Sequence, residues 1–223
     1  MAAKGLLAVA LLGAGLTLGG CLQSTVEPAS EANFTPRDKK LLAAAPYENV
    51  AIPEPYRRHV VSYHRKEMPG TIVIDSDARY LYYVMEGGQA IRYGVTVGDE
   101  ALAWSGVAKV GRMTEWPTWT PTAEIKKRMD VPDFVGSGPQ NPMGARAMYL
   151  FDGNKDTMYR IHGTNQPEYI GQAISSGCIR MTNEDVIDLY KRVKQGTVVV
   201  VLAPHQGDSP FSPRMASSGS ILR

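Results

Sequence analysis

Short β-type runs separated by glycine and proline are the feature that most constrains how this chain can fold. Between positions 70 and 203, runs rich in Val, Ile, Tyr and Thr alternate with turn residues, as in Thr71–Asp75. Gly87-Gly88 lies between two such runs, which is typical of a β-hairpin. The chain has 22 glycines and 15 prolines, and this favours many turns over a helical bundle. We therefore predict a mainly β fold.

One helix is predicted near the end of this region. Thr182 is placed as its N-cap and Asp185 as its third residue, close to a capping box. Val186 and Leu189 begin an apolar stripe with helical spacing. A second, shorter helix is predicted over 124–129.

The first twenty residues have the pattern of a secretory signal. Lys4 is their only charge, and an apolar stretch runs from it to Leu18. The sequence Leu-Gly-Gly before Cys21 resembles a bacterial lipobox, in which the cysteine is lipidated and becomes the mature N-terminus. The alternative is an ordinary cleaved signal that happens to contain a cysteine. Leu22, where an inner-membrane signal would have Asp, favours the outer membrane of a Gram-negative bacterium by resemblance to lipoprotein sorting patterns.

The remaining chain divides into three parts. Residues 21–69 are punctuated by prolines and predict a tether, with one short helix near 36–45, that holds a globular domain off the membrane. Residues 70–203 form the predicted catalytic domain, and 204–223 a flexible tail. The net charge of +2 gives no indication of a nucleic-acid partner.

The cysteine count points to chemistry at Cys178. Two cysteines in an exported protein normally indicate a disulfide. If Cys21 is lipidated, Cys178 has no partner. An unpaired thiol in an oxidising compartment is at risk of oxidation. We therefore interpret Cys178 as a nucleophile.

His162 is the predicted base for this thiol. It ends a predicted strand and precedes Cys178 by a loop long enough to return beside that strand. A free thiol is mostly protonated at neutral pH, and a neighbouring imidazole can remove its proton. A backbone carbonyl is expected to orient the imidazole. Gly177 permits close approach of a substrate, and the amides of Gly177 and Cys178 are predicted to form an oxyanion hole.

Three further side chains are candidates for substrate contact. Arg180 faces the same side as Cys178 if this segment is extended, and it would bind a carboxylate or fix the loop. Trp119, like Trp116, either lines a cleft or packs on the sheet. Tyr159 packs near His162, with core packing as the default expectation.

The motifs around His162 and Cys178 resemble the signature of the L,D-transpeptidase (YkuD-type) catalytic domain. That signature is His-Gly, a short gap, Ser-His-Gly-Cys-hydrophobic-Arg, and then a short helix. Here it corresponds to His162-Gly163 and the stretch 175–183, while 141–144 (Asn-Pro-Met-Gly) is similar to a further family motif. The resemblance covers about 70–203. Ser176 departs from it, because many members have histidine there, but a serine can still donate a hydrogen bond.

The resemblance implies a fold, an activity and a set of site residues. The fold is a β-sandwich of mixed sheets with one or two short helices. Cys178 would attack the bond between diaminopimelate and D-Ala in a peptidoglycan tetrapeptide stem. The acyl group would pass to an amine of another stem or of an outer-membrane protein. No metal or cofactor is implied. The implied catalytic residues are Cys178, His162, Gly177 and Gly163, and the implied substrate-binding residues are Arg180, Ser176, Ser175, Tyr159 and Trp119.

Three alternatives stay open from the sequence. Attack by water on the acyl-enzyme would make the protein an L,D-carboxypeptidase. A papain-like wall hydrolase is a second alternative, although that group places cysteine before histidine, whereas His162 precedes Cys178. A non-catalytic wall-binding lipoprotein is the third, and it would form no covalent adduct with a thiol-reactive carbapenem.

Overall fold

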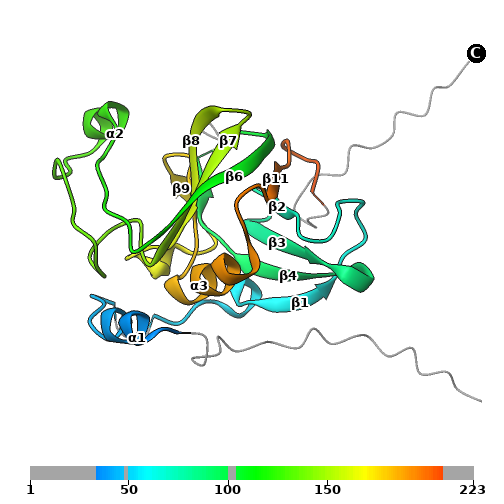
Figure 1. Cartoon of the computed structure of the whole chain (residues 1–223), viewed down its shortest axis with the longest axis horizontal. Coiled ribbons are helices and arrows are strands. Elements are labelled where there is room, and N and C mark those ends of the chain that lie inside the picture. The colour runs from blue at the N-terminus through cyan, green and yellow to red at the C-terminus, as the bar shows by residue number, and fades with distance from the viewer. Residues whose placement is uncertain (1–33, 48–49, 100–103, 208–223) are drawn as a thin grey trace, which may run out of the picture.

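The computed structural model describes residues 34–47, 50–99 and 104–207, and all structural statements concern these residues (Figure 1). The predicted signal, Cys21 and most of the predicted tail lie outside them. The mainly β fold is confirmed, with a mixed nine-stranded sheet in the order β1-β4-β3-β2-β11-β6-β7-β8-β10 and a two-stranded sheet of β5 and β9. The strands are β1 (His59–Ser62), β2 (Ile72–Asp75), β3 (Tyr80–Met85), β4 (Gln89–Gly94), β5 (Val97–Gly98), β6 (Gly106–Glu115), β7 (Arg146–Asp152), β8 (Lys155–His162), β9 (Ala173–Ser175), β10 (Ile179–Arg180) and β11 (Val198–Val201). The α-helices are α1 (Pro36–Leu42), α2 (Ala123–Arg128) and α3 (Asn183–Arg192).

The middle of the large sheet is its most apolar part. β11 pairs in parallel with β2 and antiparallel with β6. Ile72 and Ile74 of β2 and Val199 of β11 are fully buried and belong to the main core cluster. Runs of β-branched residues suit this place because a strand buried on both faces needs apolar side chains on both.

The sheet carries the site at one end. In Figure 1, β6, β7 and β8 stand together on one side of β11, and β2, β3, β4 and β1 lie on the other. The short strand β10 is added in parallel to the outer side of β8. Helix α3 packs against β7 and buries Val186, Ile187 and Leu189 in the core. Helix α3 and the core thus support β7, which pairs with β8, and β8 in turn pairs with β10.

The segment predicted as a tether differs from that expectation over its described residues. The predicted short helix is present as α1, but Asp38 in it is fully buried and contacts Arg146 of β7 at 2.8 Å. β1 joins the sheet by pairing with β4. This segment packs against the domain through the buried carboxylate of Asp38 and through the pairing of β1 with β4. Residues 34–47 and 50–69 therefore do not act as a free spacer.

The other two predicted helices are also present, as α2 and α3. Thr182 caps α3, with its hydroxyl accepting a hydrogen bond from the Asp185 amide at 3.1 Å. The carboxylate of Asp185 lies 3.9 Å from Arg58. α2 has no buried residues and stands apart from the sheet on a long loop (Figure 1). None of the helices in the described part of the chain has the length and apolar character needed to cross a bilayer.

Candidate active site

The end of β8 and the adjoining β10 bring together the residues that the sequence singled out. In their parallel register, Arg180 lies beside His162 and Ile179 beside Ile161. Both isoleucines are buried in the core. Because side chains alternate along a strand, His162 and Arg180 are directed to the other face. We call His162 and residues 175–180 the catalytic edge.

His162 is held as a neutral imidazole. Its Nδ1 lies 2.6 Å from the carbonyl oxygen of Gly163. Since a carbonyl only accepts, Nδ1 carries the proton and Nε2 keeps a lone pair. Burial and, next, the charge of Arg180 lower the pKa of His162 to about 3. The structure thus supplies the backbone acceptor that the sequence predicted, and it leaves Nε2 as a base at neutral pH.

Gly163 has a packing reason to lack a side chain. A Cβ at this position would lie 2.3 Å from Oδ1 of Asn183 and 2.9 Å from the Ala145 amide nitrogen. Asn183 is buried, accepts from that Ala145 amide at 2.8 Å, and donates to the carbonyl oxygen of Thr164 at 3.0 Å. Asn183 therefore fixes the chain directly after His162, which explains Gly163 as a positioning residue.

The loop before Cys178 is closed by Ser175. The Ser175 hydroxyl donates to the carbonyl oxygen of Cys178 at 2.6 Å and accepts from the Gly177 amide at 3.2 Å. Ser175 is 2% exposed, so the predicted substrate contact gives way to a role in shaping the loop. The Gly177 amide is engaged as well, which corrects the predicted pair of oxyanion donors and leaves the Cys178 amide.

Gly177 is required by its backbone conformation, and its neighbour Gly98 is required by the lack of space. Its φ of 112° lies in the region that favours glycine. A Cβ on Gly98 of β5 would come within 2.8 Å of the Gly177 Cα. Two glycines thus allow β5 and the Cys178 loop to touch.

Cys178 is a free, half-buried thiol. Burial raises its pKa, although a hydrogen bond from the Arg160 main chain and the charges of Arg160 and Arg180 oppose the rise. The resting thiol is therefore protonated at neutral pH, and the neutral imidazole of His162 lies on the strand β8 that pairs with β10. Such a pair forms a thiolate only when the proton moves to the base as the reaction begins.

Arg180 of the catalytic edge and Tyr159 of β8 are both half-buried. Burial lowers the pKa of Arg180, and its charge acts on both His162 and Cys178. Tyr159 stacks on Trp104, with ring centroids 5.4 Å apart, and its pKa is raised by burial and by its proximity to Cys178. These positions fit fixing of the loop and core packing, which the sequence left open.

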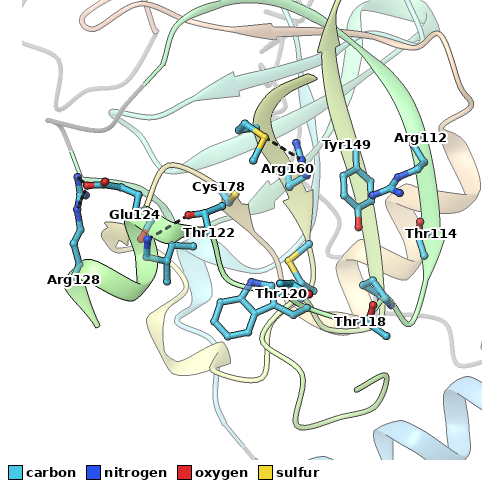
Figure 2. Close-up of a pocket in the computed structure, with 16 residues that line it drawn as sticks. Arg112, Thr114, Thr118, Thr120, Thr122, Glu124, Arg128, Tyr149, Arg160 and Cys178 are labelled. Atoms are coloured by element: carbon cyan, nitrogen blue, oxygen red, sulfur yellow. Dashed lines mark hydrogen bonds and ion pairs between the residues drawn. The ribbon is translucent and has the colours of Figure 1, made fainter. Parts of the chain in front are cut away.

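Cys178 opens onto a cleft of about 520 Å³. Ser176, Trp119 and Met143 line it, and of the two places that the sequence left open for Trp119 the structure has the cleft wall. Figure 2 places Cys178 between two ends of this cleft, with Glu124 and Arg128 of α2 at one end and Arg112 at the other. Residues 116–144 form one wall, and we call this segment the cleft arm.

The two tryptophans at the start of the cleft arm take different places. Trp119 is half-buried in the cleft wall and pairs with Val135 through a β-bridge. Trp116 is 2% exposed, and its Nε1 donates to Asp38 at 2.8 Å. α1 thereby holds the base of the arm.

Asn141 holds the cleft arm in shape, a role that the sequence did not indicate beyond its motif. It is fully buried, and its Nδ2 lies 2.8 Å from the Gly136 carbonyl oxygen and 3.1 Å from that of Pro117. Its Oδ1 accepts from the Met143 amide at 2.8 Å. One side chain thus ties both ends of the arm together.

Several cleft residues were not predicted as site residues, and three of them form one cluster. Arg112, Tyr149 and Arg160 come from β6, β7 and β8, and both guanidinium groups contact the Tyr149 ring, at 3.7 Å and 4.5 Å from its centroid. Their separation in sequence hid them. Within the described residues, no group of His, Cys, Asp or Glu side chains is arranged to hold a metal ion.

Comparison with known proteins identifies the family of this chain. Residues 69–201 match the family model YkuD, the L,D-transpeptidase catalytic domain. The chain therefore belongs to the YkuD family of L,D-transpeptidase catalytic domains.

Among curated relatives, "Probable L,D-transpeptidase YbiS" of Escherichia coli K12 is 38% identical over 159 residues, which is 67% of this chain and 48% of the relative. "Probable L,D-transpeptidase ErfK/SrfK" of the same strain is 34% identical over 142 residues, or 60% of this chain and 44% of the relative. The chain thus spans about half the length of these relatives.

A solved structure from Brucella melitensis, described as a probable carnitine operon oxidoreductase caia, is 49% identical. It covers 68% of this chain and 96% of that chain, with a TM-score of 0.46. A TM-score this low carries no argument about fold or activity.

Proposed function

We propose that this protein is a peptidoglycan L,D-transpeptidase with Cys178 as its nucleophile. The observation that carries the proposal is the catalytic edge, where a free thiol opens onto a cleft and a neutral imidazole lies on the neighbouring strand. Membership of the YkuD family supports the peptide stem of the cell wall as substrate.

The first half-reaction forms a thioester. The Cys178 thiol gives its proton to Nε2 of His162, and the sulfur attacks the carbonyl carbon between diaminopimelate and D-Ala. We assign the Cys178 amide, one of the two donors predicted from the sequence, to stabilise the developing oxyanion. When the C–N bond breaks, the proton on His162 passes to the departing amine, and D-Ala leaves with the acyl group on sulfur.

The second half-reaction returns the free thiol. An amine of another stem, or of an outer-membrane protein, attacks the thioester and gives a proton to Nε2 of His162. The C–S bond breaks and the sulfur recovers the proton. The hydrogen bond between Nδ1 and Gly163 keeps the imidazole in the required tautomer throughout both steps.

The test uses purified protein and disaccharide-tetrapeptide stems. We expect D-Ala release from the unaltered protein and none from Cys178→Ala, with the two circular-dichroism spectra alike. Cys21→Ala is the matched control, since the sequence contains only two cysteines, and it should keep full activity. D-Ala release by Cys178→Ala would reject the proposal.

The products identify what accepts the acyl group. Mass spectrometry of the digested wall would detect stems joined through their third residues if another stem is the acceptor. Stems shortened to tripeptides, without joined products, would indicate water and hence a carboxypeptidase.

We also propose that the chain works in the periplasm, anchored through a lipid on Cys21 in the outer membrane. The lipobox-like Leu-Gly-Gly-Cys sequence supports this placement. Cys21→Ser should then release the protein from membranes into the soluble periplasmic fraction, while retention of that variant in the outer membrane would reject the anchor.

A further inference from the structure

The end of the cleft farthest from α2 carries an arginine that the proposed reaction does not use. Arg112 of β6 lies with its guanidinium carbon 3.7 Å from the centroid of the Tyr149 ring, and both residues line the cleft that holds Cys178. Figure 2 shows Arg112 reaching toward Tyr149, with Thr114 beside it. Thr114 lies two residues along the same strand and also lines the cleft.

Arg112 differs from the other two arginines of the cleft. Arg160 is bound at 2.7 Å and 2.8 Å to the two oxygens of Asp156, and Arg128 pairs with Glu124 at 2.9 Å. No carboxylate pairs with Arg112 among the residues that the structure describes. Its charge does help to lower the pKa of Asp156, but both oxygens of that carboxylate are already bound by Arg160.

This arrangement suits recognition of a carboxylate. A guanidinium presents several donors in one plane and binds a carboxylate through two parallel hydrogen bonds. Stacking on Tyr149 fixes the plane of Arg112 before a ligand arrives, which reduces the entropy lost on binding. The Thr114 hydroxyl offers a further donor at the same end of the cleft.

We propose that Arg112, on its Tyr149 support, is a specificity site for a free carboxylate on the part of the stem that is retained as the acyl group. The inference rests on the proposed function. It concerns a carboxylate of the substrate that neither Cys178 nor His162 is proposed to bind. It also moves the carboxylate-binding role expected for Arg180 to a residue that lines the cleft.

The spacing of the strands limits which carboxylates of the stem can reach Arg112. β6, β7, β8 and β10 are consecutive in the sheet, and neighbouring strands lie about 4.8 Å apart. The Arg112 guanidinium lies over Tyr149 of β7, and Cys178 directly precedes β10. From β7 across β8 to β10 is two strand spacings, or about 10 Å.

The leaving D-Ala is too short to bridge this distance. Its carboxylate is within one residue of the attacked carbonyl, about 3.5 Å away. A carboxylate two residue lengths away reaches about 7 Å, and a charged hydrogen bond of about 3 Å closes the gap. On the retained part of the stem, two carboxylates fit: that of the diaminopimelate side chain, and the α-carboxylate of the second residue.

The test measures binding and turnover separately. Dissociation constants are measured by calorimetry on Cys178→Ala, with and without Arg112→Gln, for three synthetic tetrapeptide stems: one with both carboxylates free, one amidated on the third residue, and one amidated on the second. Lys109→Gln is the matched control, because Lys109 is an exposed cation of the same strand that does not line the cleft. KM and kcat for D-Ala release are measured on the same substitutions with Cys178 intact.

We expect Arg112→Gln to weaken binding of the free stem by about ten- to a hundredfold, the value of a charged hydrogen-bonded pair. KM should rise in parallel while kcat changes little. Amidation at one of the two positions should weaken binding to the Arg112 protein by the same factor, and should have no further effect once Arg112 is replaced. Arg112→Lys should recover part of the loss, and Lys109→Gln should bind all three stems like the parent protein.

The outcomes separate this inference from the proposed function. Equal binding of free and amidated stems, or an unchanged dissociation constant in Arg112→Gln, overturns the carboxylate site even if D-Ala is released. If D-Ala is not released but stem binding depends on Arg112 and on one carboxylate, the site stands and the proposed function falls. Failure of all three stems to bind rejects both.

Discussion

The catalytic edge and the cleft arm meet at Cys178 but are built by different means. The catalytic edge lies on two paired strands, and His162 is 5% exposed and fixed by a hydrogen bond of 2.6 Å. The cleft arm carries α2, which buries no residue, and its ends are held by Asn141 and by the contact between Trp116 and Asp38. Reacting groups need fixed geometry, whereas a wall that admits a polymer can be supported at a few points.

Replacement of His162 should cause the largest loss and test the role of the catalytic edge. We expect His162→Ala to lower kcat for D-Ala release by about 10²- to 10⁴-fold, because general-base catalysis contributes about that much. KM should change little, since the cleft arm is untouched. His59→Ala is the control: this histidine is buried in β1, at the opposite edge of the sheet from β10. Comparable loss of kcat in both variants would contradict the assignment.

The base of the cleft arm should depend on Asp38. Burial alone would raise the pKa of this carboxyl, but hydrogen bonds from Arg146, Thr35 and Trp116 outweigh it and lower the pKa to about 2. Asp38→Asn removes the close carboxylate partner of the buried Arg146 and leaves it only Glu115, at 4.0 Å, which should cost about 3–5 kcal/mol of unfolding free energy. Urea denaturation measures this cost.

The control is an ion pair on the exposed part of the same arm. Glu124→Gln breaks the pair with Arg128, whose side chains are 60% and 45% exposed, and should cost about 0.5 kcal/mol or less. Equal costs for the two substitutions would show that burial does not distinguish the base of the arm from its tip.

Asn141 should matter for substrate binding more than for chemistry. In Asn141→Ala the Gly136 and Pro117 carbonyls lose their buried donor, at about 1–3 kcal/mol. We expect KM for the stem to rise several-fold while kcat stays within about twofold, because the catalytic edge keeps its own hydrogen bonds. Asn154→Ala, in the exposed turn between β7 and β8, should leave both constants unchanged. A fall in kcat with constant KM would place Asn141 in the chemistry instead.

The smallest expected effect is an absence of acid inhibition. Because burial and Arg180 lower the pKa of His162 to about 3, its imidazole stays neutral from pH 7 to pH 5. An ordinary imidazole with a pKa of about 6.5 would be largely protonated at pH 5, and kcat/KM would fall by about thirtyfold. We expect kcat/KM for D-Ala release to change by less than about twofold over this range. A decline with a midpoint near pH 6.5 would contradict the buried, neutral base.

Sequence reasoning succeeded where chemistry and local pattern coincide. The backbone acceptor for the His162 imidazole and the capped helix α3 are both present as predicted, whereas the catalytic roles of His162 and Cys178 stay predictions. Trp119 could be proposed for the cleft but not separated from Trp116, because the same Trp-Pro-Thr-Trp stretch places one side chain in the cleft and the other in the core.

What the sequence could not predict depends on contacts between distant segments. β10 has two residues and gains its order from pairing with β8, so it carries no periodic signal of its own. Asp38 and Arg146 are 108 positions apart, and only the fold brings them together. The prediction that Ser175 contacts substrate differs from the structure for a related reason. Its hydroxyl donates to the Cys178 carbonyl oxygen, and this hydrogen bond depends on the shape of the loop, which the sequence does not show.

The most direct test of the central claim is intact-protein mass spectrometry during reaction with a tetrapeptide stem and no acceptor amine. We predict one acyl group for each protein molecule, of the mass of the stem less D-Ala, located at Cys178 by peptide mapping and removed when an amine is added. Release of D-Ala without any adduct at Cys178, or an adduct that persists in Cys178→Ala, would contradict the account.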